Sequence, residues 1–238
     1  STTLSSSGVV LAAAIPRFKQ LYVTPLFEQV RRLSANYVRP FIEKSPVRDM
    51  LINTSTEKSV LQRSFTNDSM MQFTFALLDA DRARGIRCDF VRIDEAQDMN
   101  RDHFPIILES MSHSPWELTQ YAGTPKTAEN TLTNLYAESS GAEWFIPCLR
   151  GGCGKWNIPS TEYDLLKMLG DVRDDITENN PGLVCASCQK PINPVHGRWV
   201  HRYPERRWDM AGYHIPQPIM HIHYSSPAKW SRVLAKQQ

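Results

Sequence analysis

Apolar and polar residues alternate along the first 147 residues in a pattern that predicts strands followed by helices. Five short apolar or β-branched segments have the length of strands: 20–24, 49–54, 70–75, 89–93 and 116–123. Two longer segments have helical apolar spacing and a proline at or beside their first turn: 26–38 and 101–111. The segment 70–75 can instead open a helix that runs to Gly85. The alternation favours the α/β class, with a parallel sheet and helices on both of its faces.

From Cys148 onward the pattern changes. Prolines become frequent, the apolar runs shorten, and two close pairs of cysteines enclose a polar stretch. The alternation of strand and helix stops here, so this part of the chain is expected to form a small module beside the sheet.

Composition narrows the class of protein only slightly. Hydrophobic residues make up 41% of the chain and charged residues 22%, which is ordinary for a globular protein. The formal charge of +2 gives no argument for nucleic acid. No apolar run approaches the roughly 20 residues of a membrane helix. We therefore expect no membrane partner and a cytoplasmic location.

Paired carboxylates follow the most strongly predicted strand, 89–93, as Asp94 and Glu95. Open α/β sheets keep their chemistry at the carboxyl ends of strands. In a nucleotide-hydrolysing site, Asp94 would hold Mg²⁺ and Glu95 would polarise the water that attacks the γ-phosphate. The alternative is an acidic turn in which Asp94 or Asp98 caps the next helix.

The next predicted strand ends in a tight polar loop formed by Gly123, Thr124 and Pro125. Carboxyl ends of neighbouring parallel strands meet at one sheet edge, so this loop is expected beside the same cleft. Thr124 or Lys126 could sense the γ-phosphate there.

Four of the five cysteines form two knuckle-like pairs, Cys148 with Cys153 and Cys185 with Cys188. Two thiolate pairs at such spacing predict a tetrahedral, structural Zn²⁺ site, and glycines around Cys153 let the first knuckle wrap the ion. Chance pairs of buried thiols, or a mixed site that uses His196, are the alternatives. Cys88 lies apart from the pairs and is expected to be a buried small residue.

Arginines and aromatic residues are interleaved between residues 198 and 208, a mixture that suits a phosphate backbone or bases. A solvated surface with arginines stacked on aromatics is the alternative. The candidate DNA-binding residues are Arg198, Arg202, Arg206 and Arg207. Histidines at 221 and 223 would share one face of a strand, and with His214 they are expected to be surface residues.

Several of these motifs resemble those of viral large terminase subunits of the tailed-phage type. "CDFVRIDEAQDMN" (88–100) and "TQYAGTPKT" (119–127) are similar to their Walker B and coupling motifs. "YVTPLFEQVRRLS" (22–34) resembles the strand and helix after their phosphate loop, and "RGIRCDFV" (84–91) the lead-in to Walker B. "MAGYHIPQPIM" (210–220), followed by Trp230, resembles the segment after their zinc ribbon.

The resemblance implies an ATPase, using ATP with Mg²⁺, that drives double-stranded DNA into a preformed capsid. It implies a P-loop-NTPase-like sheet with a zinc-ribbon insertion, divided as ATPase core 1–147, zinc ribbon 148–188 and a segment 189–238 that returns to the core. Asp94 becomes the magnesium-associated carboxylate, Glu95 the catalytic one and residues 123–125 the coupling loop. Portal protein, small terminase subunit and a homo-oligomer are the implied partners, in the host cell cytoplasm.

The sequence departs from the family in one motif, because it contains no G-x-x-x-x-G-K-[ST] phosphate loop. Ser1 or Thr2 is expected to follow such a loop and to offer its hydroxyl to Mg²⁺, with 9–15 in the first helix. A disordered Ser/Thr-rich tail is the alternative. The isolated chain is therefore expected to be inactive and to represent the middle of a terminase.

Two other functions stay open at this point. "DEAQDMN" also resembles the second motif of superfamily-one DNA helicases, although "AGTPKT" stands where their third motif would be. A zinc- and DNA-binding adaptor without catalytic activity is the other.

Overall fold

The computed structural model describes residues 2–51, 60–77, 80–127, 130–149, 151–169 and 181–236. Contacts divide the chain into two units, residues 1–134 and 135–238. Among the described residues, no helix combines the length and the apolar character needed to cross a bilayer.

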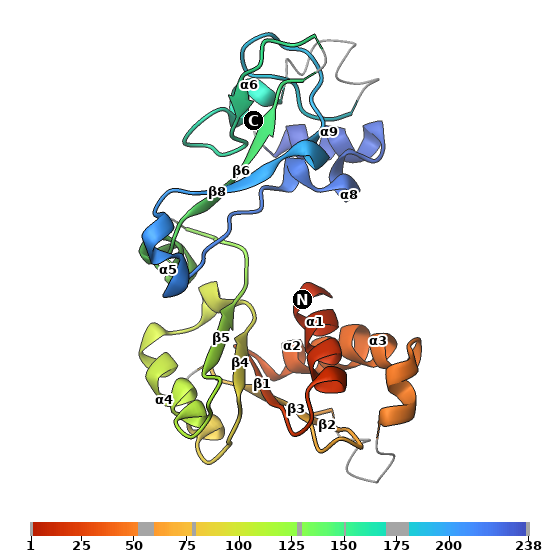
Figure 1. Ribbon diagram of the computed structural model, residues 1–238, viewed down its shortest axis with the longest axis vertical. Coiled ribbons are helices and arrows are strands. Elements are labelled where there is room, and N and C mark those ends of the chain that lie inside the picture. The colour runs from red at the N-terminus through yellow and green to blue at the C-terminus, as the bar shows by residue number, and fades with distance from the viewer. Residues whose placement is uncertain are drawn as a thin grey trace. The chain divides into compact units, whose positions relative to one another are not determined.

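Unit 1 is built on a five-stranded sheet with strand order β2-β3-β1-β4-β5 (Figure 1). β1 pairs in parallel with both β3 and β4, β4 pairs in parallel with β5, and β2 joins β3 antiparallel. The strands are β1 (Lys19–Thr24), β2 (Gln62–Ser64), β3 (Met70–Phe75), β4 (Phe90–Ile93) and β5 (Leu118–Tyr121). The predicted parallel sheet is confirmed.

Helices cover both faces of this sheet. The helices of unit 1 are α1 (Thr2–Ala14), α2 (Phe27–Arg32), α3 (Arg39–Glu43) and α4 (Phe104–Leu108); α5 (Thr131–Glu138) crosses the division between the units. A π-helical stretch, Leu33–Val38, joins α2 to α3. Apolar side chains of α1, α2 and α3 pack with Tyr22 and Phe73 on one face. On the other face Phe104 of α4 stacks on Tyr121 with ring centroids 5.3 Å apart.

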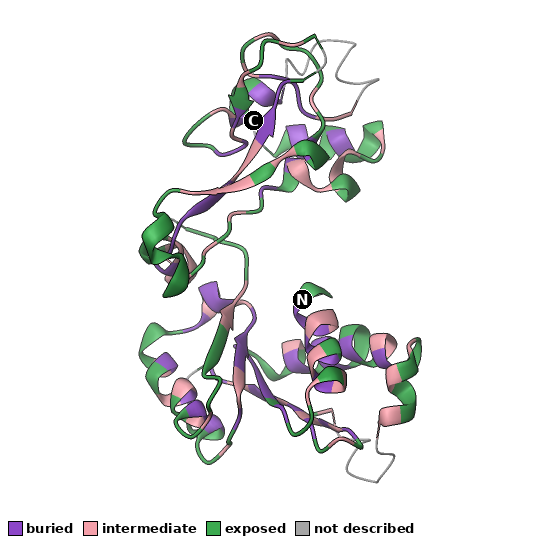
Figure 2. Ribbon diagram, in the orientation of Figure 1, coloured by how far each residue is buried: buried purple, intermediate pink, exposed green. Residues whose placement is uncertain are grey.

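The central strands β1 and β4 carry the core, because nearly all of their residues are buried, as the purple colour in Figure 2 shows. β1 has five consecutive buried residues after Lys19, the pattern of a strand covered on both faces. Burial at this level is what makes the ends of β1 and β4 a rigid base for a site.

A polar clamp formed by Gln20, Tyr22 and Arg92 fastens α1 to the sheet. Tyr22 Oη donates to the carbonyl of Leu4 at 3.0 Å, and Gln20 Nε2 donates to that of Gly8 at 2.9 Å. A Cβ at Gly8 would overlap Tyr22 Oη, so only glycine allows this approach. The helix is therefore held in one position along the strands.

The Arg92 guanidinium completes the clamp from β4 and is 1% exposed. Its Nη1 donates to Ser7 Oγ at 2.8 Å and to Gln120 Oε1 at 2.7 Å. Burial lowers its pKa from the usual arginine value. Its hydrogen bonds offset part of the desolvation of the charge, and they link α1, β4 and β5 beside the strand ends.

The structure corrects one predicted strand of unit 1 and decides between the two alternatives for 70–75. In the described part of the predicted strand 49–54, residues 49 and 50 belong to a 3₁₀ turn, Pro46–Met50, and Leu51 makes an isolated bridge to Phe65; residues 52–54 lie outside the described ranges. The optional helix from 70 to Gly85 is replaced by β3 and a short 3₁₀ turn, Asp81–Ala83. Pairing along the buried strand β1 decides the conformation of 70–75.

Unit 2 contains a three-stranded antiparallel sheet with strand order β7-β6-β8. Its elements are β6 (Ala142–Pro147), β7 (Trp156–Asn157), α6 (Leu165–Met168), β8 (Arg198–His201), α8 (His221–Tyr224) and α9 (Pro227–Ala235). Trp230 of α9 packs with Ile146 and Leu165 in a small core. His221 and His223 lie in helix α8, so the prediction that they alternate on a strand is wrong. The division at 147 and 188 stays a prediction.

Candidate functional site

The carboxylate pair lies where β4 ends and the chain turns. Asp94 is 6% exposed, and its backbone N–H donates to the carbonyl of Val23 at 2.9 Å, which continues the β1–β4 pairing by one residue. Glu95 is half-buried and has a left-handed backbone with φ 56°. The left-handed conformation at Glu95 ends the extended backbone directly after Asp94.

The loop Gly123–Pro125, named the coupling loop below, lies against this turn. The backbone N–H of Ala122 donates to Ile93 O at 2.8 Å, and that of Ala96 donates to Ala122 O at 3.0 Å. These bonds extend the β4–β5 pairing past the ends of both strands. The structure therefore brings Asp94 and Glu95 together with the exposed coupling loop.

Gln97 joins the two parts of the site and was missed by the reading of the sequence. Its Nε2 donates to Glu95 Oε2 at 2.6 Å, and its Oε1 accepts the backbone N–H of Thr124 at 3.2 Å. The available signal was an amide set between acidic residues in "DEAQD". A buried amide at such a position needs partners for both of its ends.

Lys126 and Asp98 form an ion pair of 2.7 Å. The sequence had suggested other roles for both, Lys126 as a sensor of the γ-phosphate and Asp98 as a helix cap. Asp98 does not cap the following helical segment, because Asn100 Oδ1 accepts the N–H of Asp102 at 3.0 Å and takes that role. Because Lys126 is paired with Asp98, Thr124 is the remaining candidate for sensing the γ-phosphate.

The amino-terminal candidates are only partly described. Thr2 is exposed and is the first residue of α1, whereas Ser1 lies outside the described residues. The expected first helix over 9–15 is confirmed but begins earlier. α1 reaches the sheet through the clamp on Leu4, Ser7 and Gly8.

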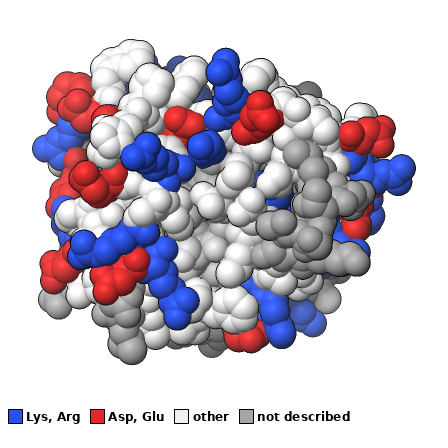
Figure 3. Space-filling view, turned by 90° about the horizontal axis from the view of Figure 1, so that it is seen from below, with Lys and Arg blue, Asp and Glu red and all other residues white. Residues whose placement is uncertain are grey.

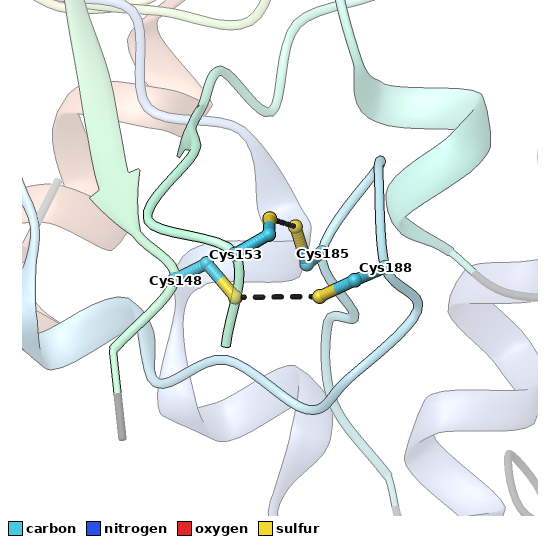
Figure 4. Close-up of side chains that lie close together, drawn as sticks. All are labelled: Cys148, Cys153, Cys185 and Cys188. Carbon is cyan, nitrogen blue, oxygen red and sulfur yellow. Dashed lines mark hydrogen bonds between the residues drawn. The ribbon is translucent and has the colours of Figure 1, made fainter. Parts of the chain in front are cut away.

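The four paired cysteines converge in unit 2 (Figure 4). Their sulfur atoms all lie within 4.8 Å of one another, with 3.6 Å between Cys148 and Cys188 and 3.6 Å between Cys153 and Cys185. Tetrahedral Zn²⁺ with bonds of about 2.3 Å needs sulfurs about 3.8 Å apart. The arrangement fits a metal ion bound by four thiolates, without His196.

Backbone geometry shapes both knuckles. Gly151 and Gly154 have φ 74° and 76°, and a Cβ at Gly152 would overlap the Cys148 sulfur. In the second knuckle the N–H of Gln189 donates to Cys185 O at 3.0 Å, and Lys190 Nζ reaches across to Gly151 O at 2.6 Å. The two turns are thus closed individually and linked to each other.

The thiols differ in acidity because their surroundings differ. Burial raises the pKa of Cys148, whereas the backbone N–H of Lys190 lowers that of Cys188. A thiol with a lowered pKa is the readier metal ligand, because the thiolate is the binding form. Cys88 is also buried, and burial raises its pKa; it contacts Ser110, not the cluster.

The four candidate arginines are exposed and each stacks on an aromatic ring. Arg198 lies over Trp156 at 4.3 Å and Arg207 over Trp208 at 4.7 Å. Arg202 is engaged by Glu162 at 2.8 Å and by Tyr163, whereas Arg206 lies over Tyr203 at 4.2 Å. Arg202 is therefore already neutralised by a carboxylate.

Charge elsewhere is mixed, in keeping with the formal total of +2. The face in Figure 3 shows Lys and Arg interspersed with Asp and Glu. In unit 2, His214 Nδ1 lies 3.0 Å from Glu143 Oε2, so this histidine has a local carboxylate partner.

Comparison with known proteins identifies the family. Residues 2–208 match the model of the phage terminase large subunit gpA, ATPase domain. The Thermus phage P74-26 large terminase ATPase domain is 17% identical, with a TM-score of 0.42, over 52% of this chain and 55% of that chain. The HK97 bacteriophage large terminase is 12% identical, with a TM-score of 0.46, over 57% of this chain and 29% of that one. Curated protein sequences gave no match.

The family model covers most of the sequence, including the carboxylate pair, the coupling loop and all four cysteines of the cluster. This chain therefore belongs to the family of phage terminase large subunits of the gpA type, in the part that forms their ATPase domain.

Proposed function

We propose that this chain, as part of a longer terminase large subunit, hydrolyses ATP to drive double-stranded DNA into a preformed capsid in the host cytoplasm. The observation that carries the proposal is the meeting of Asp94, Glu95 and the coupling loop at the carboxyl ends of β4 and β5, in a chain of this family. Carboxyl ends of parallel strands are where such sheets bind ligands.

Asp94 is the residue proposed to hold Mg²⁺. Its carboxylate offers the hard oxygen ligand that this ion prefers, and the strand end keeps it in a fixed position. When bound with ATP, Mg²⁺ neutralises charge on the β- and γ-phosphates.

Glu95 is proposed to act on water. Its carboxylate orients a water molecule towards the γ-phosphorus and accepts a proton as the new P–O bond forms. The bond between the γ-phosphorus and the bridging oxygen breaks, and ADP leaves with that electron pair. Half-burial suits this role, because the carboxylate is reachable by water while Gln97 restrains it.

The phosphate cradle is proposed to come from a Gly-rich loop ending in Lys, joined upstream of Ser1. The hydroxyl of Ser1 or Thr2 would then be a further ligand of Mg²⁺ at the start of α1. In the sheet order β5 is at the edge, and Leu118 is 40% exposed, so among the described strands this edge is open to a further parallel strand.

The thiol cluster is proposed to bind structural Zn²⁺. Four cysteines leave no open coordination position, so the ion would brace unit 2 and take no part in hydrolysis. DNA contact is proposed for Arg198, Arg206 and Arg207, and more weakly for Arg202 because of its pairing with Glu162. Portal protein, small terminase subunit and further copies of the chain are proposed partners.

The proposal is tested by Glu95→Gln in the complete large subunit. ATP turnover is expected to fall by about 10²–10⁴-fold, while nucleotide binding and the melting temperature stay near the parent values. Glu109→Gln, at an exposed carboxylate, is the matched control and should hydrolyse ATP normally. Turnover by Glu95→Gln at the parent rate would refute the assignment and favour a zinc- and DNA-binding adaptor.

A further inference from the structure

Gln97 uses both ends of one buried amide to connect Glu95 with the coupling loop. The side chain is part of a residue only 8% exposed. Its Nε2 lies 2.6 Å from Glu95 Oε2, and its Oε1 lies 3.2 Å from the backbone nitrogen of Thr124. The amide orientation follows from its partners, because only NH₂ can donate to the carboxylate and only the carbonyl can accept from a backbone N–H.

The coupling loop approaches Gln97 more closely than a side chain at position 123 would allow. A Cβ at Gly123 would overlap Gln97 Oε1 and come within 3.2 Å of the backbone nitrogen of Ala96. Glycine therefore serves here to bring the loop backbone onto the amide. Any shift of the loop must move Thr124 N–H relative to Gln97.

Glu95 depends on this restraint for its orientation. Glu95 follows β4 with a left-handed backbone, and a glutamate without partners samples many rotamers. The hydrogen bond from Gln97 selects one of them. The rate of phosphoryl transfer depends strongly on the position of the attacking water. The orientation of the Glu95 carboxylate should therefore affect the rate as well as its charge.

We propose that Gln97 is a positioning residue through which the coupling loop controls the aim of Glu95. With the loop seated, Gln97 is held by Thr124 and keeps the carboxylate in place. When the loop moves away, Gln97 Oε1 loses the N–H of Thr124 that donates to it, and Glu95 is released from its position. The inference rests on the proposed function and adds to it the route by which loop movement regulates hydrolysis.

The first test compares Gln97→Met with Gln97→Ala in the complete large subunit. Methionine fills a similar volume but makes neither hydrogen bond, so it separates packing from positioning. Both variants are expected to lower kcat by about 10- to 100-fold with KM nearly unchanged. Gln217→Met, at an exposed glutamine of unit 2, is the control. Parent-like turnover by Gln97→Met would overturn the proposal.

A double-mutant cycle with Gly123→Ala tests the coupling itself. Alone, Gly123→Ala should lower turnover, because its Cβ displaces the Gln97 carbonyl. In the Gln97→Ala background the overlap is removed, so the same change should cost little more. Effects that simply multiply would contradict a shared route.

A third test measures hydrogen exchange and does not depend on ATP turnover. Hydrogen exchange of the Thr124 amide should quicken in Gln97→Met, because that N–H loses its acceptor; unchanged protection would overturn the link. Glu95→Gln, run in parallel, separates the two levels. If it retains turnover, the proposed function fails and this inference with it. If it abolishes turnover while Gln97→Met hydrolyses normally, only the coupling fails.

Discussion

The polar clusters of the two units differ in what they hold together. In unit 1 the polar side chains of the clamp find partners within the chain, as Tyr22 does on Leu4 and Arg92 does on Ser7 and Gln120. In unit 2, where Asn157 and Glu143 are also paired, four cysteine sulfurs converge within 4.8 Å of one another in an arrangement that fits a metal ion.

The two units also differ in what stabilises them. Unit 1 has a sheet with helices on both faces and a large apolar cluster between the sheet and α1, α2 and α3. The core of unit 2 is a smaller cluster around Trp230. We propose that a metal ion at the four cysteines adds to the stability of unit 2, because the free energy of metal binding then contributes to folding.

The largest effect is expected from Cys185→Ser. Zinc content should fall from one ion per chain to well below one, because a structural site contributes about 10–16 kcal/mol. Metal analysis measures the content, and limited proteolysis should show cleavage confined to unit 2. Cys88→Ser, at a buried thiol outside the cluster, should keep the metal. If Cys185→Ser kept its zinc, the proposed difference between the units in their source of stability would be refuted.

The next effect concerns unit 1 and the missing phosphate loop. The 238-residue chain alone should bind ATP weakly and show no turnover, because the sequence has no phosphate-loop motif. Joining an upstream strand and a Gly-rich loop ending in Lys to Ser1 should restore binding, measured by calorimetry. Turnover by the isolated chain that is lost in Glu95→Gln would show that the phosphate site lies elsewhere.

A smaller effect tests the clamp of unit 1. Gly8→Ala should destabilise the chain by about 1–3 kcal/mol through overpacking against Tyr22, measured by denaturant unfolding. Combining it with Tyr22→Phe should relieve part of that cost, because the overlapping hydroxyl is gone. Val10→Ala, at a residue 62% exposed on the same helix, should change stability by less than about 0.5 kcal/mol.

The smallest effect is expected from Arg207→Gln in unit 2. Loss of one phosphate contact should weaken binding to double-stranded DNA similarly for all sequences and reduce the salt dependence of log K by about one. Arg48→Gln, at an exposed arginine of unit 1, is the matched control. An equal response of both variants would show that unit 2 has no special role in DNA contact.

The sequence predicted those parts of the fold in which local pattern and tertiary burial agree. β1, β4 and β5 were recognisable because each combines strand-forming residues with a polar turn at its end. Residues 70–75 were ambiguous because their apolar run fits either a helix or a strand, and pairing with β1 settles the outcome. The alternation of histidines at 221 and 223 suggested a strand. The segment instead forms the short helix α8, which packs against α9.

The candidate site could be predicted at the level of residue types, not of contacts, and the roles of its residues stay predictions. Asp94, Glu95, the coupling loop and the four cysteines were identified from spacing and position. Gln97 was not, because its role depends on an approach by Thr124 from 27 positions along the chain. The same holds for the Lys126–Asp98 pair, which no local pattern indicates.

The left-handed backbone at Glu95 lowers the stability of the fold at the same residue that is proposed to be catalytic. A glutamate with φ 56° costs about 1–2 kcal/mol relative to an ordinary conformation, and Glu95→Gly would relieve that cost while deleting the carboxylate. Under the role proposed for Glu95, the resulting protein would be more stable but would not hydrolyse ATP, so a selection for thermal tolerance alone would accept this change. Under that role, the strained turn is kept only by selection for hydrolysis.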